Sequence, residues 1–173
     1  MPTHSGGMEF FMRNTGNLCS VLGSGADAEA LVYGSSKYPD IRGRVLFYEL
    51  RNFVIVCAEI IGLPQNKGAC SSPVFAFHIH EGTECSGNEN DAFANAKMHY
   101  NPNNCPHPYH AGDMPPLFGA NGSALSVFMT DRFTLSEIIG KTVIIHAQPD
   151  DFVTQPSGNA GEKIACGVIE SIR

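Results

Sequence analysis

Histidine dominates the chemistry that this sequence can support. Six of its seven histidines lie between positions 78 and 146. They form a pair two residues apart, a close group and a distant single residue: His78 and His80, then His99, His107 and His110, then His146. Any one of them alone would more simply be a solvated or core residue. Because neutral imidazole is the commonest nitrogen ligand for zinc and copper, the six together predict a metal-binding protein.

The spacing divides these ligands between two sites. One compact group, within fifteen positions of the chain, consists of His99, His107, His110 and Asp113. Three imidazoles and one carboxylate fill a tetrahedral zinc site, which leaves no position for substrate and makes that zinc structural. His146 ends a separate apolar run and would join His78 and His80 in a second site. That second site keeps an open position for chemistry.

Short runs of β-branched and aromatic residues between turn residues must position these ligands. We expect strands over residues 30–33, 42–50, 53–61, 74–80, 124–130, 141–147 and 163–172. Arg51 and Asn52 would form a tight hairpin turn. Thr134 and Glu137 have capping-box spacing, which predicts one helical turn before Ile138. Seven or eight short strands without long helices indicate an all-β sandwich or barrel.

Alternation along residues 74–80 explains how two histidines reach one metal. Phe75, Phe77 and Ile79 would lie on one face and fill the core. His78 and His80 would point to the other face, where only a loop can cover them.

Two long irregular segments contain or adjoin all the expected ligands. Residues 81–122 are rich in Asn, Pro and His, and residues 148–162 are rich in Pro, Asp and Gly. Long loops in a compact β domain are usually functional. We therefore expect these two loops to build the site.

Composition limits the remaining choices. The chain has 173 residues, which suits one domain, over residues 28–173, after a loosely ordered arm, over residues 1–27. Its net charge of −6, without a run of basic residues, argues against nucleic-acid binding. No apolar run is long enough to span a bilayer, which argues against a membrane protein. No signal peptide is recognisable, so we expect a cytoplasmic protein or the mature form of an exported one.

The six cysteines include no C-x-x-C pair, which excludes zinc-finger and thioredoxin-like readings. Their number permits disulfides without proving an oxidising compartment. Cys57 lies in an apolar run and is expected to be a buried free thiol. Cys105 is expected to pack beside the zinc group rather than to bind metal. Cys19 and Cys70 have no partner that the sequence can assign.

Several motifs together resemble the copper,zinc superoxide dismutase family. In chain order they are Phe77-His78-Ile79-His80-Glu81-Gly82, His99-Tyr100-Asn101-Pro102, His110-Ala111-Gly112-Asp113, Gly158-Asn159-Ala160-Gly161 and Ala165-Cys166-Gly167-Val168-Ile169. The similarity covers about residues 30–172, and the joint occurrence of these motifs is highly specific. It implies a Greek-key β-sandwich, a flattened barrel of about eight antiparallel strands with two long functional loops.

The resemblance also implies roles for individual residues. It implies copper ligands at His78, His80, His99 and His146. It implies zinc ligands at His99, His107, His110 and Asp113. His99 would therefore touch both metals and carry a proton during catalysis.

Further positions match the family outside the ligand set. Asp150 matches a carboxylate that links a copper ligand to a zinc ligand. Cys85 and Cys166 match the intrasubunit disulfide, and the short gap from His80 to Cys85 resembles the bacterial branch. Lys163 stands where the family has an arginine that guides the substrate; lysine keeps the charge but loses the planar two-pronged donor.

Two loop lengths also depart from many family members. Only two residues separate His107 from His110, and the loop at residues 151–157 is short.

The implied function is dismutation of superoxide to dioxygen and hydrogen peroxide, with copper and zinc as cofactors and superoxide as the substrate. The resemblance also suggests a homodimer. One alternative is a non-catalytic module that holds or delivers copper on the same fold. Another is a structural β-sandwich that holds zinc alone. Both alternatives predict a damaged copper site, whereas all three copper-type histidines outside the zinc group are present.

Overall fold

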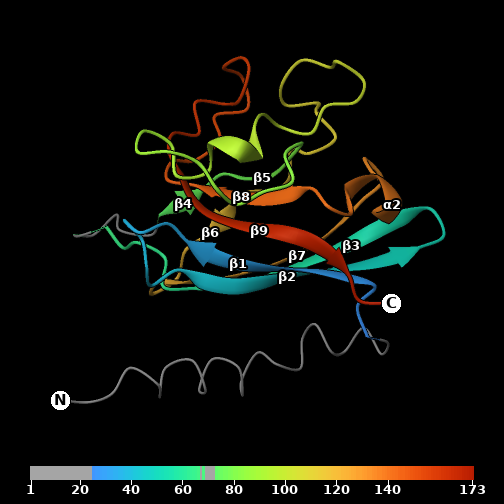
Figure 1. Ribbon diagram of the computed structural model, residues 1–173, viewed down its shortest axis with the longest axis horizontal. Helices are drawn as coiled ribbons and strands as arrows, with labels where there is room; N and C mark the ends of the chain where they lie inside the picture. The colour runs from blue at the N-terminus through green and yellow to red at the C-terminus, as the bar shows by residue number, and fades with distance from the viewer. Residues whose placement is uncertain (1–24, 67, 69–72) are drawn as a thin grey trace.

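The computed structural model describes residues 25–66, 68 and 73–173, and their regular structure is almost entirely β-strand (Figure 1). The strands are β1 (Ala28–Gly34), β2 (Arg42–Leu50), β3 (Phe53–Ile61), β4 (Val74–Phe75), β5 (Phe77–His80), β6 (Leu117–Phe118), β7 (Ser123–Thr130), β8 (Thr142–His146) and β9 (Lys163–Ser171). Two short helical segments are η2 (Ala94–Ala96) and α2 (Leu135–Ile138). Cys19, Cys70 and nearly all of the expected arm over residues 1–27 lie outside the described residues.

Seven antiparallel strands form one curled sheet in the order β5-β8-β9-β1-β2-β3-β7, and β4 pairs with β6 in a second, small sheet. Neighbours such as β5 and β8, or β9 and β1, are distant in the chain, which is the Greek-key pattern. The expected all-β Greek-key sandwich is therefore confirmed. Among the described residues, no helix has the length and apolar character needed to cross a membrane.

Local sequence accounts for most element boundaries. β2 and β3 have the expected limits, and Leu50 pairs with Phe53 across the tight turn. α2 begins after Thr134, whose backbone N–H donates to the Glu137 carboxylate at 2.6 Å, as the capping-box spacing predicted. Alternating apolar side chains from all the long strands meet in one core, including Val32, Phe47, Val56, Phe77, Ile145 and Ile169.

The expected strand over residues 74–80 is wrong as one element, because it changes partner at Ala76. Phe75 pairs with Leu117 in the small sheet, whereas Phe77 pairs with Ile145 of β8. Ala76 donates to Gln148 O at 2.8 Å instead. A continuous apolar run does not reveal such a change. Strand β6 was missed because it has only two residues.

The expectation of a free thiol at Cys57 is also wrong. Cys57 is fully buried in β3, as expected, but it is disulfide-bonded. An apolar run predicts burial of a thiol, but it does not reveal whether the thiol has a partner.

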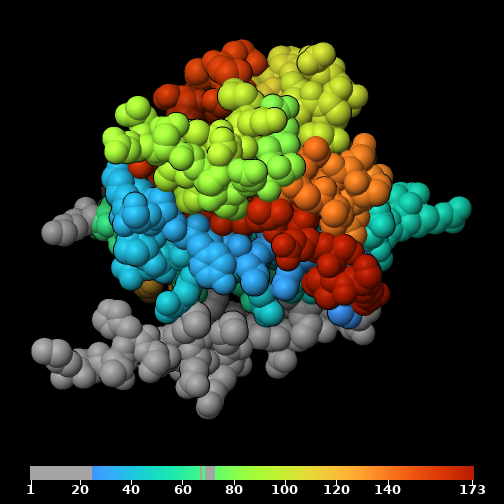
Figure 2. Space-filling model, viewed as in Figure 1, coloured from blue at the N-terminus to red at the C-terminus, as the bar shows by residue number. Residues whose placement is uncertain are grey.

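The two long loops gather on the side of the fold that carries β5 and β8 (Figure 1). In the space-filling view their residues cover this side as a continuous cap (Figure 2). The cap is the part of the molecule in which the expected metal ligands lie.

Candidate metal centre

Two buried groups of potential metal ligands lie next to each other under the cap. One consists of His78, His80, His99 and His146, which the sequence assigned to copper and which we call the copper group. The other consists of His99, His107, His110 and Asp113, which the sequence assigned to zinc and which we call the zinc group. In each group one ligand atom per residue lies within 4.8 Å of all the others. The structure therefore brings together every ligand that the sequence predicted, and His99 belongs to both groups.

Strand pairing places three of the copper-group rings. His78 and His80 come from β5, whose neighbour β8 ends at His146. Phe77 and Ile79 fill the core from the opposite face, as alternation predicted. The imidazoles of the two strands converge, with His80 Nε2 at 3.2 Å from His146 Nε2.

The first long loop returns across β5 and delivers the zinc group. Ile79 N–H donates to Gly112 O, and Ile79 O accepts from Tyr100 N–H, both at 2.8 Å. A side chain at Gly112 would place its Cβ only 2.2 Å from Ile79 O, so this approach requires glycine. Bridges from His78 to Asp113 and from His80 to His99 complete the contact.

Backbone carbonyls orient two of the copper-group rings. His80 Nδ1 donates to Lys97 O at 2.9 Å, and His146 Nδ1 donates to Gly161 O at 3.2 Å. With the proton on Nδ1, each ring turns an unprotonated Nε2 toward the other ligands of its group. Such hydrogen bonds fix the tautomer that a metal needs.

Asp150 connects the two groups from behind, as the resemblance implied. Its two carboxylate oxygens lie 2.8 Å from His78 Nε2 and 2.9 Å from His107 Nε2. Gly158, at a φ of 67°, passes so close that an added Cβ would lie 2.0 Å from Asp150 Oδ1. The glycine of the Gly-Asn-Ala-Gly motif thus makes room for this carboxylate.

Three buried ring nitrogens make no hydrogen bond within the part of the chain that the structure describes: His78 Nδ1, His99 Nε2 and His107 Nδ1, the last of which lies 3.0 Å from Asp113 Oδ2. All three belong to the ligand groups, and a buried polar atom without a partner is destabilising. His99 Nδ1, in contrast, lies 2.7 Å from Asp113 Oδ1. His99 thus presents one nitrogen to each group. The four imidazoles of the copper group are a donor set that suits copper. The three imidazoles and one carboxylate of the zinc group are a donor set that suits zinc.

Burial keeps these imidazoles neutral. It lowers the pKa of His78 to about 4, against the opposing effect of its hydrogen bond to Asp150. Burial likewise lowers the pKa of His146 to about 3 and that of His80 well below its usual value. Although burial alone would raise the pKa of Asp113, its hydrogen bond with His99 and the neighbouring rings lower it overall. Neutral imidazoles and an ionised carboxylate are the forms that bind metals.

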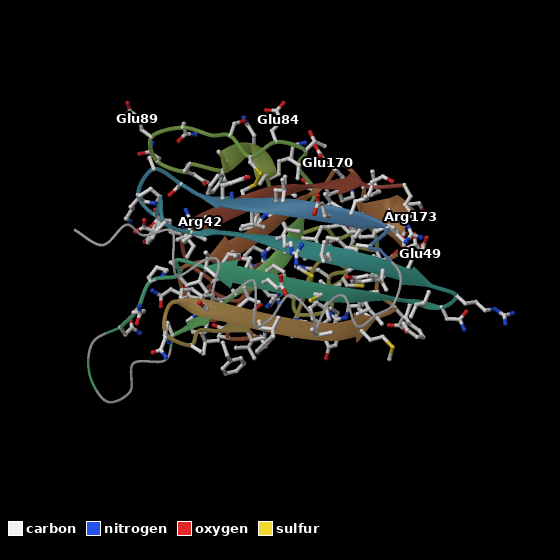
Figure 3. All side chains as sticks on the ribbon, turned by 90° about the horizontal axis from the view of Figure 1, so that it is seen from below. Arg42, Glu49, Glu84, Glu89, Glu170 and Arg173 are labelled. Carbon is white, nitrogen blue, oxygen red and sulfur yellow. A yellow bond between two sulfur atoms is a disulfide. The ribbon has the colours of Figure 1, made fainter. Side chains whose placement is uncertain are left out.

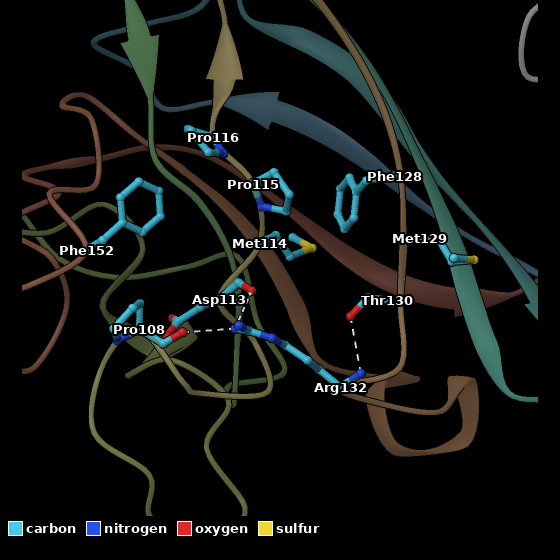
Figure 4. Close-up of a pocket in the computed structure, with 10 residues that line it drawn as sticks. All are labelled: Pro108, Asp113, Met114, Pro115, Pro116, Phe128, Met129, Thr130, Arg132 and Phe152. Atoms are coloured by element: carbon cyan, nitrogen blue, oxygen red, sulfur yellow. Dashed lines mark hydrogen bonds between the residues drawn. The ribbon is translucent and has the colours of Figure 1, made fainter.

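Arg132 holds the loop that carries the zinc group, a contact that no sequence pattern predicted. Its Nη1 donates to Pro108 O at 2.9 Å and to the carbonyl oxygens of His110 and Asp113, both at 3.2 Å. The side chain reaches these carbonyls from the segment after β7, at the edge of a pocket whose other walls are mostly apolar (Figure 4). In sequence, an arginine after an exposed strand end looks like an ordinary solvated residue.

Gln155 fixes His107 by two hydrogen bonds, and it too was missed. Its Oε1 accepts from His107 N–H at 3.0 Å, and its Nε2 donates to His107 O at 2.7 Å. A glutamine in a loop has no pattern that predicts such a contact. Together with Asp150, it places His107 in the zinc group despite the short spacing to His110.

The remaining expected residues have defined places. Cys85 and Cys166 form a disulfide, which ties the first long loop to β9. Cys105 is a free, partly buried cysteine outside both ligand groups. Lys163 lies opposite His146 in the ladder between β8 and β9, and its ammonium pairs with Asp91. The sequence had not indicated this acidic partner.

A β-sandwich whose loops bury two ligand groups joined by one histidine defines a class of proteins that hold two neighbouring metal ions. Comparisons with known proteins agree with this class. The family model described as copper/zinc superoxide dismutase (SODC) matches residues 41–169. The chain therefore belongs to the copper/zinc superoxide dismutase family.

Three bacterial proteins illustrate the similarity. A Cu-Zn superoxide dismutase of Aquifex aeolicus, numbered 2, is 34% identical over 145 residues, which cover 75% of this chain and 80% of that protein. The Cu-Zn superoxide dismutase of Legionella pneumophila is 31% identical over 161 residues, with 88% and 93% covered. That of Photobacterium leiognathi is 36% identical over 133 residues, with 64% and 77% covered.

Proposed function

We propose that this chain dismutates superoxide, so that two superoxide anions and two protons give dioxygen and hydrogen peroxide. The observation that carries the proposal is His99, which presents one ring nitrogen to each of two buried ligand groups. When bound, copper would supply one-electron redox chemistry and zinc would supply a fixed positive charge, held by the two groups that share His99. The family matches and the intact copper group support this reading.

The chain contributes geometry and proton transfer. The carbonyl-anchored rings of His80 and His146 and the carboxylate-anchored ring of His78 stay fixed through the cycle. His99 Nε2 has no protein partner among the described residues, so it can take up a proton and release it to the reduced substrate. His99 Nδ1 remains on the zinc side, beside Asp113.

Lys163 supplies local attraction for the substrate in this proposal. The chain has a net charge of −6, which opposes the approach of a small anion. A cation beside the copper group offsets this repulsion at short range. Lys163 lies opposite His146 in the strand ladder and is the lysine that matches the family's guiding arginine.

The alternative of a copper-holding or zinc-only module is not favoured. Both alternatives require a damaged copper group, whereas its four imidazoles converge and are buried. A homodimer remains a prediction from the family resemblance, which sedimentation equilibrium would test. The compartment also remains a prediction, and the disulfide between Cys85 and Cys166 suits an oxidising one.

Metal analysis of the purified protein, combined with a dismutation assay, tests the proposal. We expect about one copper and one zinc per chain, with activity that follows the copper content. Zinc alone at full occupancy after exposure to both metals would support a structural module. Full occupancy by both metals without dismutation would overturn the proposal, because an intact copper group would then hold copper without catalysis.

A further inference from the structure

Lys163 lies opposite His146 in the strand ladder, but its ammonium is not an isolated cation. Its Nζ lies 2.7 Å from Asp91 Oδ2 and 3.2 Å from Phe93 O. The lysine side chain is only 14% exposed, and that of Asp91 is 39% exposed. Because the pair is partly withdrawn from solvent, salt screens it less than it screens a surface pair.

Asp91 is itself held firmly. Its other oxygen, Oδ1, accepts from Phe93 N–H at 3.0 Å, and its own N–H donates to Asn88 Oδ1 at 3.1 Å. The loop that carries it is fixed to β9 by the disulfide between Cys85 and Cys166. Both charges of the pair are therefore attached to the same rigid frame.

Two physical consequences follow from this geometry. Lysine carries a point charge on a flexible stem, whereas arginine has a planar fork that orients itself. A partner is therefore needed to give the ammonium one position. The same partner, however, turns the bare charge into a close pair of opposite charges, whose field decreases faster with distance than that of a single cation.

We propose that Asp91 is a positioning residue that holds the ammonium of Lys163 beside the copper group and limits its attraction for small anions. The proposal rests on the proposed function, since it concerns the approach of an anion to the copper group. The effect of holding the ammonium in place can be separated from the effect of the negative charge, because Asp91→Asn and Asp91→Ala remove the same charge. Asn keeps an oxygen that can accept from Lys163, and Ala does not.

Azide, a small monoanion that ligates copper(II), is the probe. Its dissociation constant is measured by optical titration of the copper- and zinc-loaded protein at low and high salt. At low salt we expect Asp91→Asn to bind azide roughly twofold to fivefold more tightly than wild type, because the cation is no longer compensated. The gain should shrink at high salt. Asp91→Ala should increase azide affinity less than Asp91→Asn does, since the ammonium of Lys163 is no longer held in place.

Glu89→Gln is the matched control. It removes one negative charge from the same loop, but Glu89 is exposed and points away from the fold (Figure 3). We expect its azide affinity to stay close to that of wild type. Pulse radiolysis of the same variants should show the same order for the rate of superoxide removal.

The outcomes separate this proposal from the function on which it rests. Equal azide affinities in Asp91→Asn and Glu89→Gln, or weaker binding in Asp91→Asn, would overturn the role of Asp91. Lys163→Met should weaken azide binding. If its azide affinity equals that of a wild type that dismutates superoxide, Lys163 does not guide anions. The role proposed for Asp91 would then be wrong as well. A wild type with both metals but no dismutation would overturn the proposed function itself.

Discussion

Asp150 Oδ2 lies 2.8 Å from His78 Nε2, and neither side chain has more than 1% of its surface exposed. This contact leaves His78 Nδ1 as the nitrogen that faces the copper group. Because the second oxygen of Asp150 contacts His107 in the zinc group, one carboxylate orients ligands of both metals.

Asp150→Asn should therefore weaken both sites. The amide can accept only through its oxygen and must donate through its nitrogen, so one of the two rings loses its proper tautomer. We expect copper and zinc affinities to fall by about 10-fold to 100-fold, as measured by chelator competition. Asp131→Asn, a substitution of the same chemistry at an exposed position, serves as the control. Unchanged affinities for both metals in Asp150→Asn would contradict the linking role.

Arg132→Gln should loosen the loop of the zinc group. Three carbonyl oxygens lose the guanidinium that gathers them. We expect weaker zinc binding in competition with a chelator, and faster hydrogen exchange over residues 107–113. The exposed Arg51, in the turn between β2 and β3, provides the control Arg51→Gln. If the two variants bind zinc equally well, the contacts of Arg132 do not support the site.

Loss of the disulfide should destabilise the fold. Cys85 and Cys166 are 81 positions apart, and closing such a loop stabilises by about 4–5 kcal/mol on the chain-entropy model. The double substitution to Ser should lower the free energy of unfolding of the metal-free protein by about this amount, measured by denaturant titration. Cys105→Ser removes the free thiol and should change stability little. A double variant no less stable than this control would refute the prediction. The partner of Cys57 is a separate question, which peptide mapping under non-reducing conditions would answer.

The metal-free protein should lose stability as pH falls below about 6.5. In the unfolded chain histidine has a pKa of about 6.5, whereas burial lowers it to about 4 at His78 and about 3 at His146. At a pH between the pKa of the unfolded state and that of the folded state, the unfolded chain binds more protons than the folded one. Each of these histidines therefore lowers the free energy of unfolding by roughly 1.4 kcal/mol for each pH unit of acidification. Thermal unfolding at pH 7.5, 6 and 5 measures the effect. A melting temperature that is constant or rises toward pH 5 would show that the imidazoles are not buried as described.

The sequence predicted which residues gather in the two ligand groups, partly through local chemistry and partly through the family resemblance. A strand of alternating residues placed His78 and His80 on one face, and apolar runs gave the limits of β2 and β3. Capping chemistry predicted α2 from Thr134 and Glu137. Such features follow from interactions between residues close in the chain.

The supporting contacts could not be predicted, because they join residues far apart in the chain. Arg132 and Gln155 reach the zinc group across 22 and 48 positions, and Lys163 reaches Asp91 across 72. The change of partner at Ala76 depends on how two sheets meet rather than on its neighbours in sequence. Tertiary packing decides all of these, and no local pattern encodes them.

Pulse radiolysis of the copper- and zinc-loaded protein, with His80→Ala as its partner variant, tests the central claim most directly. We predict that the wild type accelerates the decay of superoxide by orders of magnitude, in proportion to its copper content. His80→Ala should abolish this acceleration while keeping the fold and the zinc, because His80 belongs to the copper group alone. A fully loaded wild type that leaves the decay unchanged, or a variant as fast as the wild type, would contradict the account.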